Sequence, residues 1–397
     1  MKIAIFSDSF YPELSGITDS ITFLGKALAL RGHKIVYFAP RYSEKNYKTS
    51  NLAQTEQDLG ANIRVIRLPS IPYPFSPNNQ GRIAIPIGSG LMAMKQCAPD
   101  VIHTQTSMGP GIEAMLSSRL LKIPLVGTNH TPISEFMKSS PNWLVQAALN
   151  YTSWYYNRCC FVSAPCQSLL DEMKSHGFNS PSKPVPNPID TKAFTPVKDL
   201  NEKKDLKNLL GFSNFTILYT GRLAPEKQVD VIVKAVALAA KQIPDISFAA
   251  TGHGSSEKYL KELTEKLGIQ DRVKFLGFVK DQEYPLLYKA SDVFVIMSKA
   301  ESQSLSLMDA MLTGLPVIGA DARALPEYID EKSGVVVPVG NDLKLSEAII
   351  DLYNNPKKAT KLGHGGIASA SRYAPPLIAE IWEKIYQDAI SSNKKVL

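Results

Sequence analysis

The chain has 397 residues, of which 44% are hydrophobic and 20% are charged, so it can bury the cores of two or three domains. This balance excludes a disordered polyelectrolyte, and no apolar run reaches the 18 positions expected of a transmembrane helix. The formal net charge is +7, and the four cysteines contain no CxxC pair and no disulfide framework, so we expect a reducing compartment, the cytoplasm.

The first half of the chain alternates between short apolar runs and helix-like patterns. The opening run, residues 3–6, lacks the long apolar core and the cleavage site of a signal peptide. A helix pattern follows over residues 17–31 and ends at Gly32, a typical helix stop. Further strands are predicted over residues 34–39, 63–68, 100–104, 124–128 and 160–163, and further helices over residues 83–96, 110–121 and 143–157.

The alternation stops after Pro184 and then starts again. Residues 185–212 are rich in proline and charge, which is typical of a linker. Beyond them a second series begins, and a last helix pattern, residues 378–390, follows a break at Pro375 and Pro376. Strands are predicted over residues 216–220, 247–251, 273–276, 293–297, 316–319 and 334–337, and helices over residues 229–241, 257–267, 282–289, 305–312 and from about 344.

Two successive series of strands and helices predict an α/β fold with two Rossmann-like, doubly wound domains. We place the first domain in residues 1–195, the second in residues 196–375 and a C-terminal helix in residues 376–397. In such domains, ligands bind beyond the carboxyl ends of the strands. Two domains that face each other across a cleft would bring a donor on one and an acceptor on the other to a shared site.

A loop with two cations follows the strand predicted at residues 216–220. It reads Gly-Arg-Leu-Ala-Pro-Glu-Lys over residues 221–227 and opens a helix. A helix N-terminus attracts anions, Arg222 can hold a phosphate with two N–H groups, and Lys227 adds a point charge. The loop therefore indicates a diphosphate site, although a surface turn with a lysine at the helix start would look the same.

Two carboxylates bracket the start of a later helix. Glu301 comes shortly after a predicted strand, and Asp309 lies eight residues further on. Because the helix starts near Ser304, the backbone N–H groups of Ser304, Leu305 and Ser306 point toward any bound anion. One carboxylate could accept hydrogen bonds from sugar hydroxyls and the other from a ribose diol. A capping acid and a surface acid are the alternative interpretation.

These two stretches resemble the donor-binding elements of the family 4 glycosyltransferases, retaining enzymes of the GT-B fold. The loop at residues 221–227 is similar to the family's donor-phosphate loop, and Glu301 with Asp309 is similar to its E-x7-E element. Two positions depart from the family pattern, because Asp309 replaces a glutamate and Ser304 replaces a glycine. Shorter pieces match in the same order, at residues 12–16, 31–33, 99–103, 128–131, 185–190, 276–279 and 290–292.

The resemblance implies a role for each matching residue of the second domain. Arg222 and Lys227 would neutralise the nucleotide diphosphate as it leaves. Glu301 would hold the hydroxyls of the donor sugar, and Asp309 would take the ribose. Val279 would contact the base, largely through its backbone.

The resemblance also implies roles at two helix starts and one strand end. The N–H groups of residues 304–306 would support the sugar and the phosphate. Gly16 would let the first domain's backbone approach the diphosphate, because a side chain there would obstruct it. His130 would face the reacting sugar, although a lone histidine at a strand end is often just a satisfied polar group. We expect His103, at an equivalent strand end, to be structural.

The implied reaction is transfer of a hexose from a UDP- or GDP-sugar with retention at the anomeric carbon. The sequence offers no carboxylate pair typical of a glycoside hydrolase, so positioning and charge stabilisation would supply most of the rate. It contains no D-x-D metal element, so we expect no metal and no other cofactor. A phosphorylase or sucrose synthase-like activity, or a nucleotide-sugar-binding protein that is catalytically weak because of Ser304 and Asp309, remains an alternative.

Three features suggest a lipid acceptor. Residues 1–195 carry 18 Lys and Arg against 12 Asp and Glu, residues 71–75 form an apolar, aromatic loop, and aromatic residues crowd one predicted helix. Basic and aromatic residues suit an anionic membrane surface, which would make the enzyme peripheral on the inner face of the membrane. The Glu-Ser-Gln-Ser run at residues 301–304 and the loop at residues 71–75 are similar to the glycolipid-making branch of the family, which includes diacylglycerol glucosyltransferases. The crowded aromatic residues are Trp143, Tyr151, Trp154, Tyr155 and Tyr156.

The acceptor nevertheless has other interpretations. The aromatic residues could be core, and the basic excess could be an ordinary solvated surface. A soluble acceptor or a polysaccharide therefore stays open. We expect no nucleic-acid partner, because the sequence has neither a basic run of five residues nor a nucleic-acid-binding motif.

Overall fold

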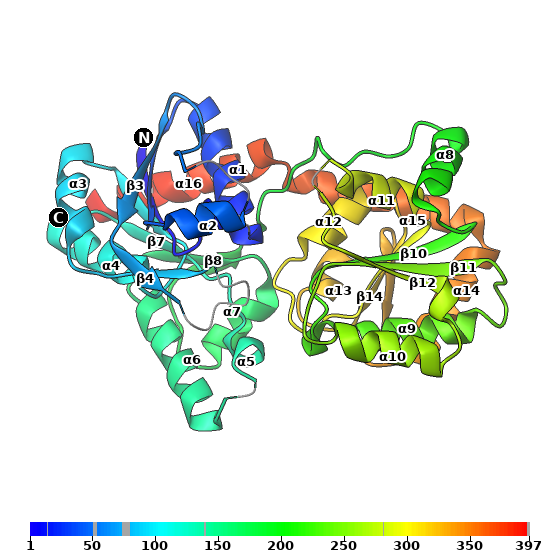
Figure 1. Ribbon diagram of the computed structural model, residues 1–397. Helices are drawn as coiled ribbons and strands as arrows, with labels where there is room; N and C mark the ends of the chain where they lie inside the picture. The colour runs from blue at the N-terminus through cyan, green and yellow to red at the C-terminus, as the bar shows by residue number, and fades with distance from the viewer. Residues whose placement is uncertain (14, 51–53, 74–79, 139, 281, 395–397) are drawn as a thin grey trace. The chain divides into compact units, whose positions relative to one another are not determined.

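The computed structural model describes residues 1–13, 15–50, 54–73, 80–138, 140–280 and 282–394, which form two compact units. The first unit contains Met1–Ile189 and Tyr373–Leu397, and the second contains Asp190–Arg372. In Figure 1 each unit is a twisted sheet with helices on both of its faces. We expected boundaries after residues 195 and 375. The chain leaves the first unit after Ile189 and returns to it at Tyr373.

The sheet of the first unit has seven parallel strands in the order β3-β2-β1-β6-β7-β8-β9. The strand order changes direction between β1 and β6, where Ile3 pairs with Val101. Both faces of this sheet are covered, so its central strands are continuously apolar rather than alternating. The strands are β1 (Lys2–Phe6), β2 (Lys34–Pro40), β3 (Ile63–Leu68), β6 (Val101–Thr104), β7 (Leu125–Thr128), β8 (Phe161–Ala164) and β9 (Ser182–Pro184).

Helices lie between successive strands of this sheet along the chain, as the crossover connections of parallel strands require. The first begins where the Ser15 hydroxyl accepts a hydrogen bond from the Thr18 backbone N–H. A short antiparallel pair, β4 (Ser70–Pro72) and β5 (Arg82–Ala84), lies outside the main sheet. The helices are α1 (Gly16–Leu30), α2 (Glu44–Thr49), α3 (Ser89–Cys97), α4 (Pro110–Leu121), α5 (Ile133–Phe136), α6 (Asn142–Tyr156) and α7 (Gln167–Lys174).

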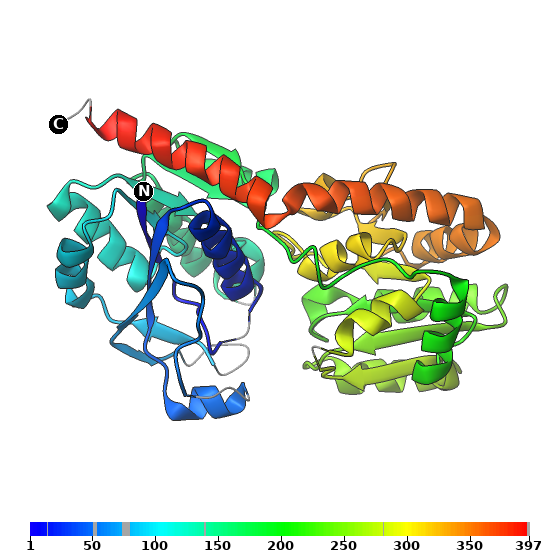
Figure 2. The same cartoon turned by 90° about the horizontal axis from the view of Figure 1, so that it is seen from above.

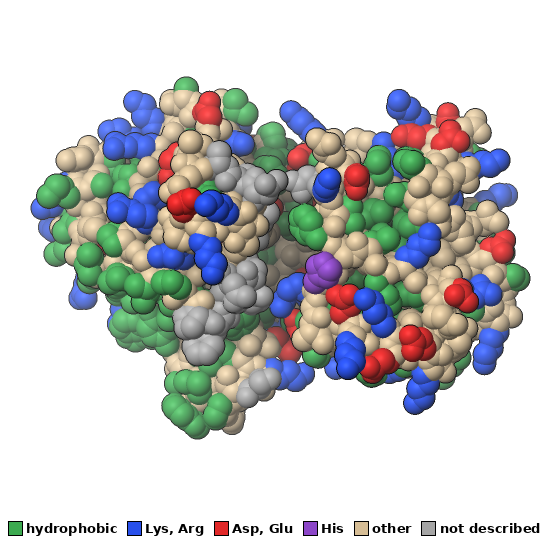
Figure 3. Space-filling model, viewed as in Figure 1, with side chains coloured by type: hydrophobic (Ala, Val, Ile, Leu, Met, Phe, Trp, Pro, Cys, Tyr) green, Lys and Arg blue, Asp and Glu red, His purple; other side chains and the backbone are tan. Residues whose placement is uncertain are grey.

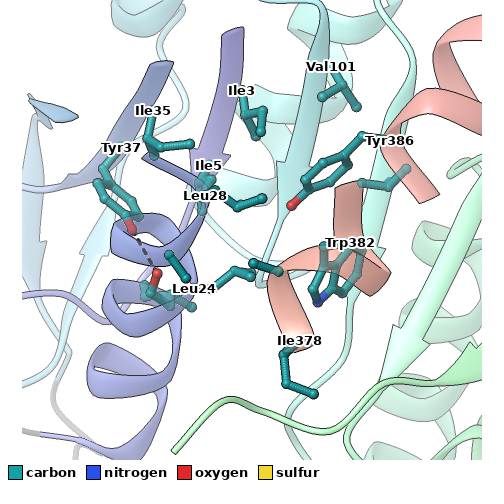
Figure 4. Close-up of a cluster of buried hydrophobic side chains, with 14 of the residues drawn as sticks. Ile3, Ile5, Leu24, Leu28, Ile35, Tyr37, Val101, Ile378, Trp382 and Tyr386 are labelled. Atoms are coloured by element: carbon teal, nitrogen blue, oxygen red, sulfur yellow. Dashed lines mark hydrogen bonds between the residues drawn. The ribbon is translucent and has the colours of Figure 1, made fainter. Parts of the chain in front are cut away.

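The C-terminal helix α16 (Pro375–Lys394) packs against α1 of the first unit, as Figure 2 shows. Its Trp382 and Tyr386 point into the same core as Ile3 of β1 (Figure 4). At the surface, the Glu383 carboxylate binds Arg31 at 2.5 Å and His33 at 3.1 Å. The last helix of the chain therefore completes the core that surrounds its first strand.

The second unit repeats the same arrangement with six parallel strands in the order β12-β11-β10-β13-β14-β15. Its strands are β10 (Phe215–Thr220), β11 (Ile246–Thr251), β12 (Val273–Gly277), β13 (Val293–Ile296), β14 (Val317–Ala320) and β15 (Gly334–Val337). Its helices are α8 (Leu200–Leu210), α9 (Val229–Ala239), α10 (Glu257–Lys266), α11 (Tyr284–Ala290), α12 (Leu305–Leu312), α13 (Leu325–Tyr328), α14 (Asp342–Asn354) and α15 (Pro356–Ala370). Short 3-10 helices cover Pro225–Lys227 and Gln270–Arg272, and another, Ser371–Tyr373, leads back to the first unit.

Two secondary-structure predictions were wrong. The helix predicted over residues 83–96 begins only at Ser89, because Arg82–Ala84 pairs with the preceding strand. The expected linker contains the helix α8, which starts at the Asp199 cap and ends at Gly211 with a positive φ of 61°. The charged residues of this stretch predict a linker, yet Lys203 and Lys207 both bind Asp292 and hold the helix on the second unit.

Candidate active site

The second sheet reverses its strand order between β10 and β13, and the loops that leave these two strands carry the predicted donor site. Leu218 of β10 pairs with Phe294 of β13, so the strands are immediate neighbours. Arg222 and Lys227 follow β10, and Glu301 follows β13. In an open parallel sheet this reversal is the position at which ligands bind.

Lys227 and Glu301 lie in direct contact. The Lys227 ammonium is 2.5 Å from Glu301 Oε1, and the two side chains are only 17% and 13% exposed. The Lys299 backbone N–H also donates to the Glu226 carbonyl at 3.0 Å, which ties the two loops together beside this pair. The structure thus brings the cation of one predicted element and the carboxylate of the other into a single polar site.

Arg222 lies at the exposed edge of the same loop. Its guanidinium contacts Glu226 Oε1 at 3.0 Å, and the side chain is 56% exposed. The Tyr219 hydroxyl donates to the Arg222 carbonyl at 2.8 Å, so the backbone is held while the side chain remains accessible. An exposed guanidinium can bind an anion while the backbone of its loop stays in place.

A glycine-rich loop after β11, which we did not single out from the sequence, packs against the Arg222 loop. A Cβ atom on Gly252 would lie 2.1 Å from the Gly221 carbonyl oxygen, and one on Gly254 would lie 2.2 Å from the Leu223 carbonyl oxygen. The Leu223 N–H donates to the His253 carbonyl at 3.0 Å. The Gly-His-Gly sequence directly after a predicted strand was the available signal, because close backbone contact needs residues without a side chain.

The start of α12 explains one departure from the family pattern. Ser304 is the N-cap, and its hydroxyl accepts a hydrogen bond from the Leu307 N–H at 3.3 Å. The hydroxyls of Ser304 and Ser306 lie 3.0 Å apart. Leu305 is the first residue of the helix, so N–H groups of this first turn are available at its positive end. Serine at position 304 therefore supplies the cap that a glycine would not.

Asp309 lies near two tyrosines of α11. Burial, and then the negative charge of Asp309, raise the pKa of Tyr284, and both factors also contribute to the raised pKa of Tyr288. The Tyr288 hydroxyl is 2.7 Å from the Thr220 hydroxyl and donates to Tyr284 at 3.0 Å. Asp309 thus lies near a row of hydrogen-bonded hydroxyl groups that ends at Thr220, the last residue of β10.

Val279 is half-buried in the loop after β12. The loop adjoins the glycine-rich loop, because the Gly252 N–H donates to the Gly277 carbonyl at 2.7 Å. The loops after β10, β11 and β12 therefore form one continuous set at the carboxyl edge of the sheet.

In the first unit, Gly16 and His130 also lie beyond the carboxyl ends of strands. Gly16 is the exposed first residue of α1, after β1. His130 follows β7 and is buried, with Nε2 2.7 Å from the Gln105 side-chain oxygen. Burial lowers the pKa of His130 to about 4, so its imidazole is neutral at pH 7. Gln105, directly after β6, is a neighbour that sequence reasoning missed.

His103 differs from His130 in that both of its nitrogens have partners. Nδ1 is 2.8 Å from the Tyr386 hydroxyl, and Nε2 is 2.8 Å from the Thr128 hydroxyl. Burial, together with the nearby His130, lowers the pKa of His103 to about 3. These contacts leave His103 no free nitrogen and place it between the sheet and α16.

Two further findings concern only the described part of the chain. No three His, Cys, Asp or Glu side chains there are grouped so that they could hold a metal ion. No helix there is both long and apolar enough to cross a membrane.

Comparisons with known proteins identify the family. Residues 14–193 match Glycosyltransferase Family 4, and residues 201–368 match Glycosyl transferases group 1. The chain belongs to the family 4 glycosyltransferases. The predicted class of enzyme, a hexosyltransferase that uses a nucleotide sugar, is confirmed.

Two similar proteins are named as synthases of a glycolipid. The alpha-monoglucosyldiacylglycerol synthase of Acholeplasma laidlawii is 25% identical over 100% of this chain and 99% of its own length. The protein of the same name from Streptococcus pneumoniae is 27% identical over 84% of this chain and 74% of its own length.

A solved structure confirms the predicted fold. Anabaena HepE in complex with UDP superposes with a TM-score of 0.77 at 20% identity, covering 98% of this chain and 100% of that one. The predicted α/β fold with two Rossmann-like sheets is therefore correct.

We expect Arg222→Ala to lower kcat roughly 10²–10³-fold, because it removes a preorganised charge from the diphosphate. The matched control is Lys261→Ala, since Lys261 is similarly exposed and also pairs with a glutamate four residues away, Glu257. Steady-state kinetics with a nucleotide-sugar donor measure the effect. Near-native turnover of Arg222→Ala, or an equal loss in the control, would contradict the phosphate role.

Burial of His130 also predicts a pH dependence of stability. Its pKa is lowered to about 4, below the ordinary value of about 6.5 in the unfolded chain, so protons favour unfolding as the pH falls from about 6.5 toward 4. We expect the unfolding free energy of the native protein to fall more steeply between pH 6.5 and 5 than that of His130→Gln, by up to about 1.4 kcal/mol per pH unit.

Tryptophan fluorescence during urea unfolding measures this slope, because all three tryptophans, Trp143, Trp154 and Trp382, belong to the first unit. His176→Gln, which replaces a half-buried histidine of the same unit, is the control for the substitution itself. Equal slopes for the native protein and His130→Gln would show that His130 is not held neutral by folding.

Proposed function

We propose that this hexosyltransferase transfers the sugar with retention to a lipid of the diacylglycerol type at a membrane surface. The observation that carries the proposal is the similarity to the Acholeplasma laidlawii synthase, which spans nearly the full length of both chains. That protein is named for an alpha-linked glucosyl product. Since UDP-glucose is itself alpha-linked, such a product retains the configuration of the donor.

The second unit supplies the donor-binding groups of this proposal. Arg222 and Lys227 neutralise the departing diphosphate, and Glu301 orients the sugar hydroxyls. The contact between Lys227 and Glu301 supports this division, because it places a cation and an acceptor of hydrogen bonds side by side. Asp309 accepts hydrogen bonds from the ribose, and the loop at Val279 contacts the base.

Two more groups of residues complete the donor site in this proposal. The N–H groups of residues 304–306, at the start of α12, support the sugar and the phosphate. Gly16 gives its backbone to the diphosphate, and the neutral imidazole of His130 contacts the reacting sugar. The exposed position of Gly16 and the neutral state of His130 are compatible with these roles.

Exposed apolar side chains of the first unit support a lipid acceptor. Trp143 is 71% exposed at the start of α6, and Leu144 follows it; Figure 3 shows hydrophobic side chains at this surface. Tyr155 and Tyr156 are buried in the core, so the predicted aromatic surface is only partly correct. Ile71 of the predicted loop is exposed. Residues 74 and 75 of that loop lie outside the described residues.

A soluble acceptor is the second candidate. The D-inositol 3-phosphate glycosyltransferase of Corynebacterium diphtheriae is 25% identical over 84% of this chain and 82% of its own length. An acidic sugar alcohol phosphate would suit the basic excess of the first half without any membrane contact.

We expect hexose transfer to diacylglycerol in vesicles that contain anionic phospholipid, and little transfer to inositol phosphate or free sugars. The assay supplies UDP-glucose, UDP-galactose, UDP-GlcNAc and GDP-mannose separately, and mass spectrometry resolves the products. The anomeric proton coupling of the product tests retention. Product found only with soluble acceptors would reject the lipid, and donor hydrolysis without transfer would favour a weak binding protein.

The exposed tryptophan provides a test of the membrane surface. Trp143→Ser should lower transfer to vesicles about tenfold, because one exposed aromatic anchor is lost from the interface. Leu30→Ser is the matched control, since Leu30 is also exposed, on α1. Transfer to diacylglycerol dispersed in detergent should be unchanged in both variants, and an equal loss there would remove the membrane role of Trp143.

We propose that transfer needs no divalent metal, because Arg222 and Lys227 supply the charge that neutralises the diphosphate. EDTA should therefore leave the rate of transfer unchanged. The control adds back magnesium or manganese after EDTA treatment. Loss of activity with EDTA that either ion restores would contradict this proposal.

A further inference from the structure

One nitrogen of His130 has no partner among the described residues, although the side chain is buried. His130 is 7% exposed, and its Nδ1 atom is fully covered without a hydrogen bond from the part of the chain that the structure describes. A buried polar nitrogen without a partner is costly, so such atoms usually have a specific use. Its other nitrogen, Nε2, does have a partner in Gln105.

Gln105 decides which nitrogen of His130 carries the proton. The Gln105 side-chain oxygen lies 2.7 Å from His130 Nε2, and an amide oxygen can only accept a hydrogen bond. Nε2 must therefore be the N–H donor. Because the ring is neutral, Nδ1 then carries a lone pair and can accept a hydrogen bond.

The other end of the Gln105 amide faces His103. Its nitrogen lies 3.1 Å from His103 Nε2 and 3.3 Å from Nδ1. The neutral His103 ring has one nitrogen with a lone pair, and the amide nitrogen shares that nitrogen with its hydroxyl partner. This contact turns the oxygen end of Gln105 toward His130.

His103 is itself held by α16. Its ring centroid lies 4.2 Å from that of Trp382, and its Nδ1 lies 2.8 Å from the Tyr386 hydroxyl. Trp382 and Tyr386 stack at 5.5 Å and belong to the buried core of the first unit. A continuous set of contacts thus runs from the C-terminal helix through His103 and Gln105 to His130.

We propose that Gln105 is a positioning residue that holds His130 in the tautomer with its proton on Nε2, so that Nδ1 is presented as an acceptor of a hydrogen bond. Tyr386 acts indirectly, because its hydroxyl fixes the His103 ring and that ring contacts the Gln105 amide. The group that Nδ1 accepts from is a hydroxyl of the reacting sugar, and this part rests on the proposed function of His130. The C-terminal helix is then part of the catalytic apparatus and not only of the core.

Nitrogen NMR of the full chain labelled at histidine reads the tautomer directly. The chain has six histidines, and the His130 signals are assigned by their loss in His130→Gln. In the native protein we expect a protonated Nε2 and an unprotonated Nδ1. In Gln105→Leu the two forms should mix, whereas Gln105→Glu, which keeps an acceptor oxygen, should retain the native tautomer. A protonated Nδ1 in the native protein would overturn the proposal.

Kinetics test whether this arrangement serves the reaction. Gln105→Leu should lower kcat roughly 100-fold and Tyr386→Phe about tenfold, with little change in the KM of the donor. Gln105→Glu should recover part of the loss. The matched control is Tyr37→Phe, which also removes a buried hydroxyl, bonded to the Ile21 carbonyl at 2.7 Å in the same core, but does not touch His103.

The outcomes separate this inference from the proposed function. Equal kcat losses in Tyr37→Phe and Tyr386→Phe would show that Tyr386 is merely structural and would overturn its role. Native kcat in Gln105→Leu, with the tautomers mixed, would overturn the role of Gln105. Native activity of His130→Ala would instead remove His130 from the proposed function, whatever tautomer the NMR spectra show.

Discussion

Parallel pairing of strands is the constraint on which the rest of this structure depends. A parallel sheet needs crossover connections and a cover on both faces, and it brings all carboxyl ends to one edge. Where the strand order reverses, between β10 and β13, the two departing loops diverge and leave room for side chains. Lys227 and Glu301 meet there, although 74 residues separate them in the sequence. The position of the proposed donor site is therefore a consequence of strand order before it is a consequence of any single residue.

The first unit is also built on parallel strands, but its core is completed by the C-terminal helix. Its sheet begins with β1, and one face of that core is closed by α16, which supplies Trp382 and Tyr386. Because α16 belongs to the first unit, the chain passes through the second unit and returns. This return places the Tyr386 hydroxyl on His103, and so connects the last helix to the polar residues that follow β6 and β7.

The two units avoid an uncompensated charge on their polar side chains in different ways. Lys227 and Glu301 stay partly accessible and satisfy each other as an ion pair. His103 and His130 are buried, and desolvation lowers the pKa of both imidazoles, so they remain neutral and form hydrogen bonds instead. The difference agrees with the proposed roles, a charged diphosphate at the second unit and uncharged hydroxyl groups at the first. The two departures from the family pattern keep polar groups at this place in the second unit. Ser304 caps α12, and Asp309 remains a carboxylate near Tyr284.

The sequence by itself determined the two series of strands and helices, since apolar runs and helix stops are local signals. It also determined the family, because the loop at Arg222 and the acids at 301 and 309 keep their spacing. Only the tertiary structure decided that the helix over residues 200–210 is held on the second unit by ion pairs to Asp292. It alone placed Gln105 beside His130 and Tyr386 beside His103. These contacts join residues that are far apart in the chain, so no local pattern could have carried them.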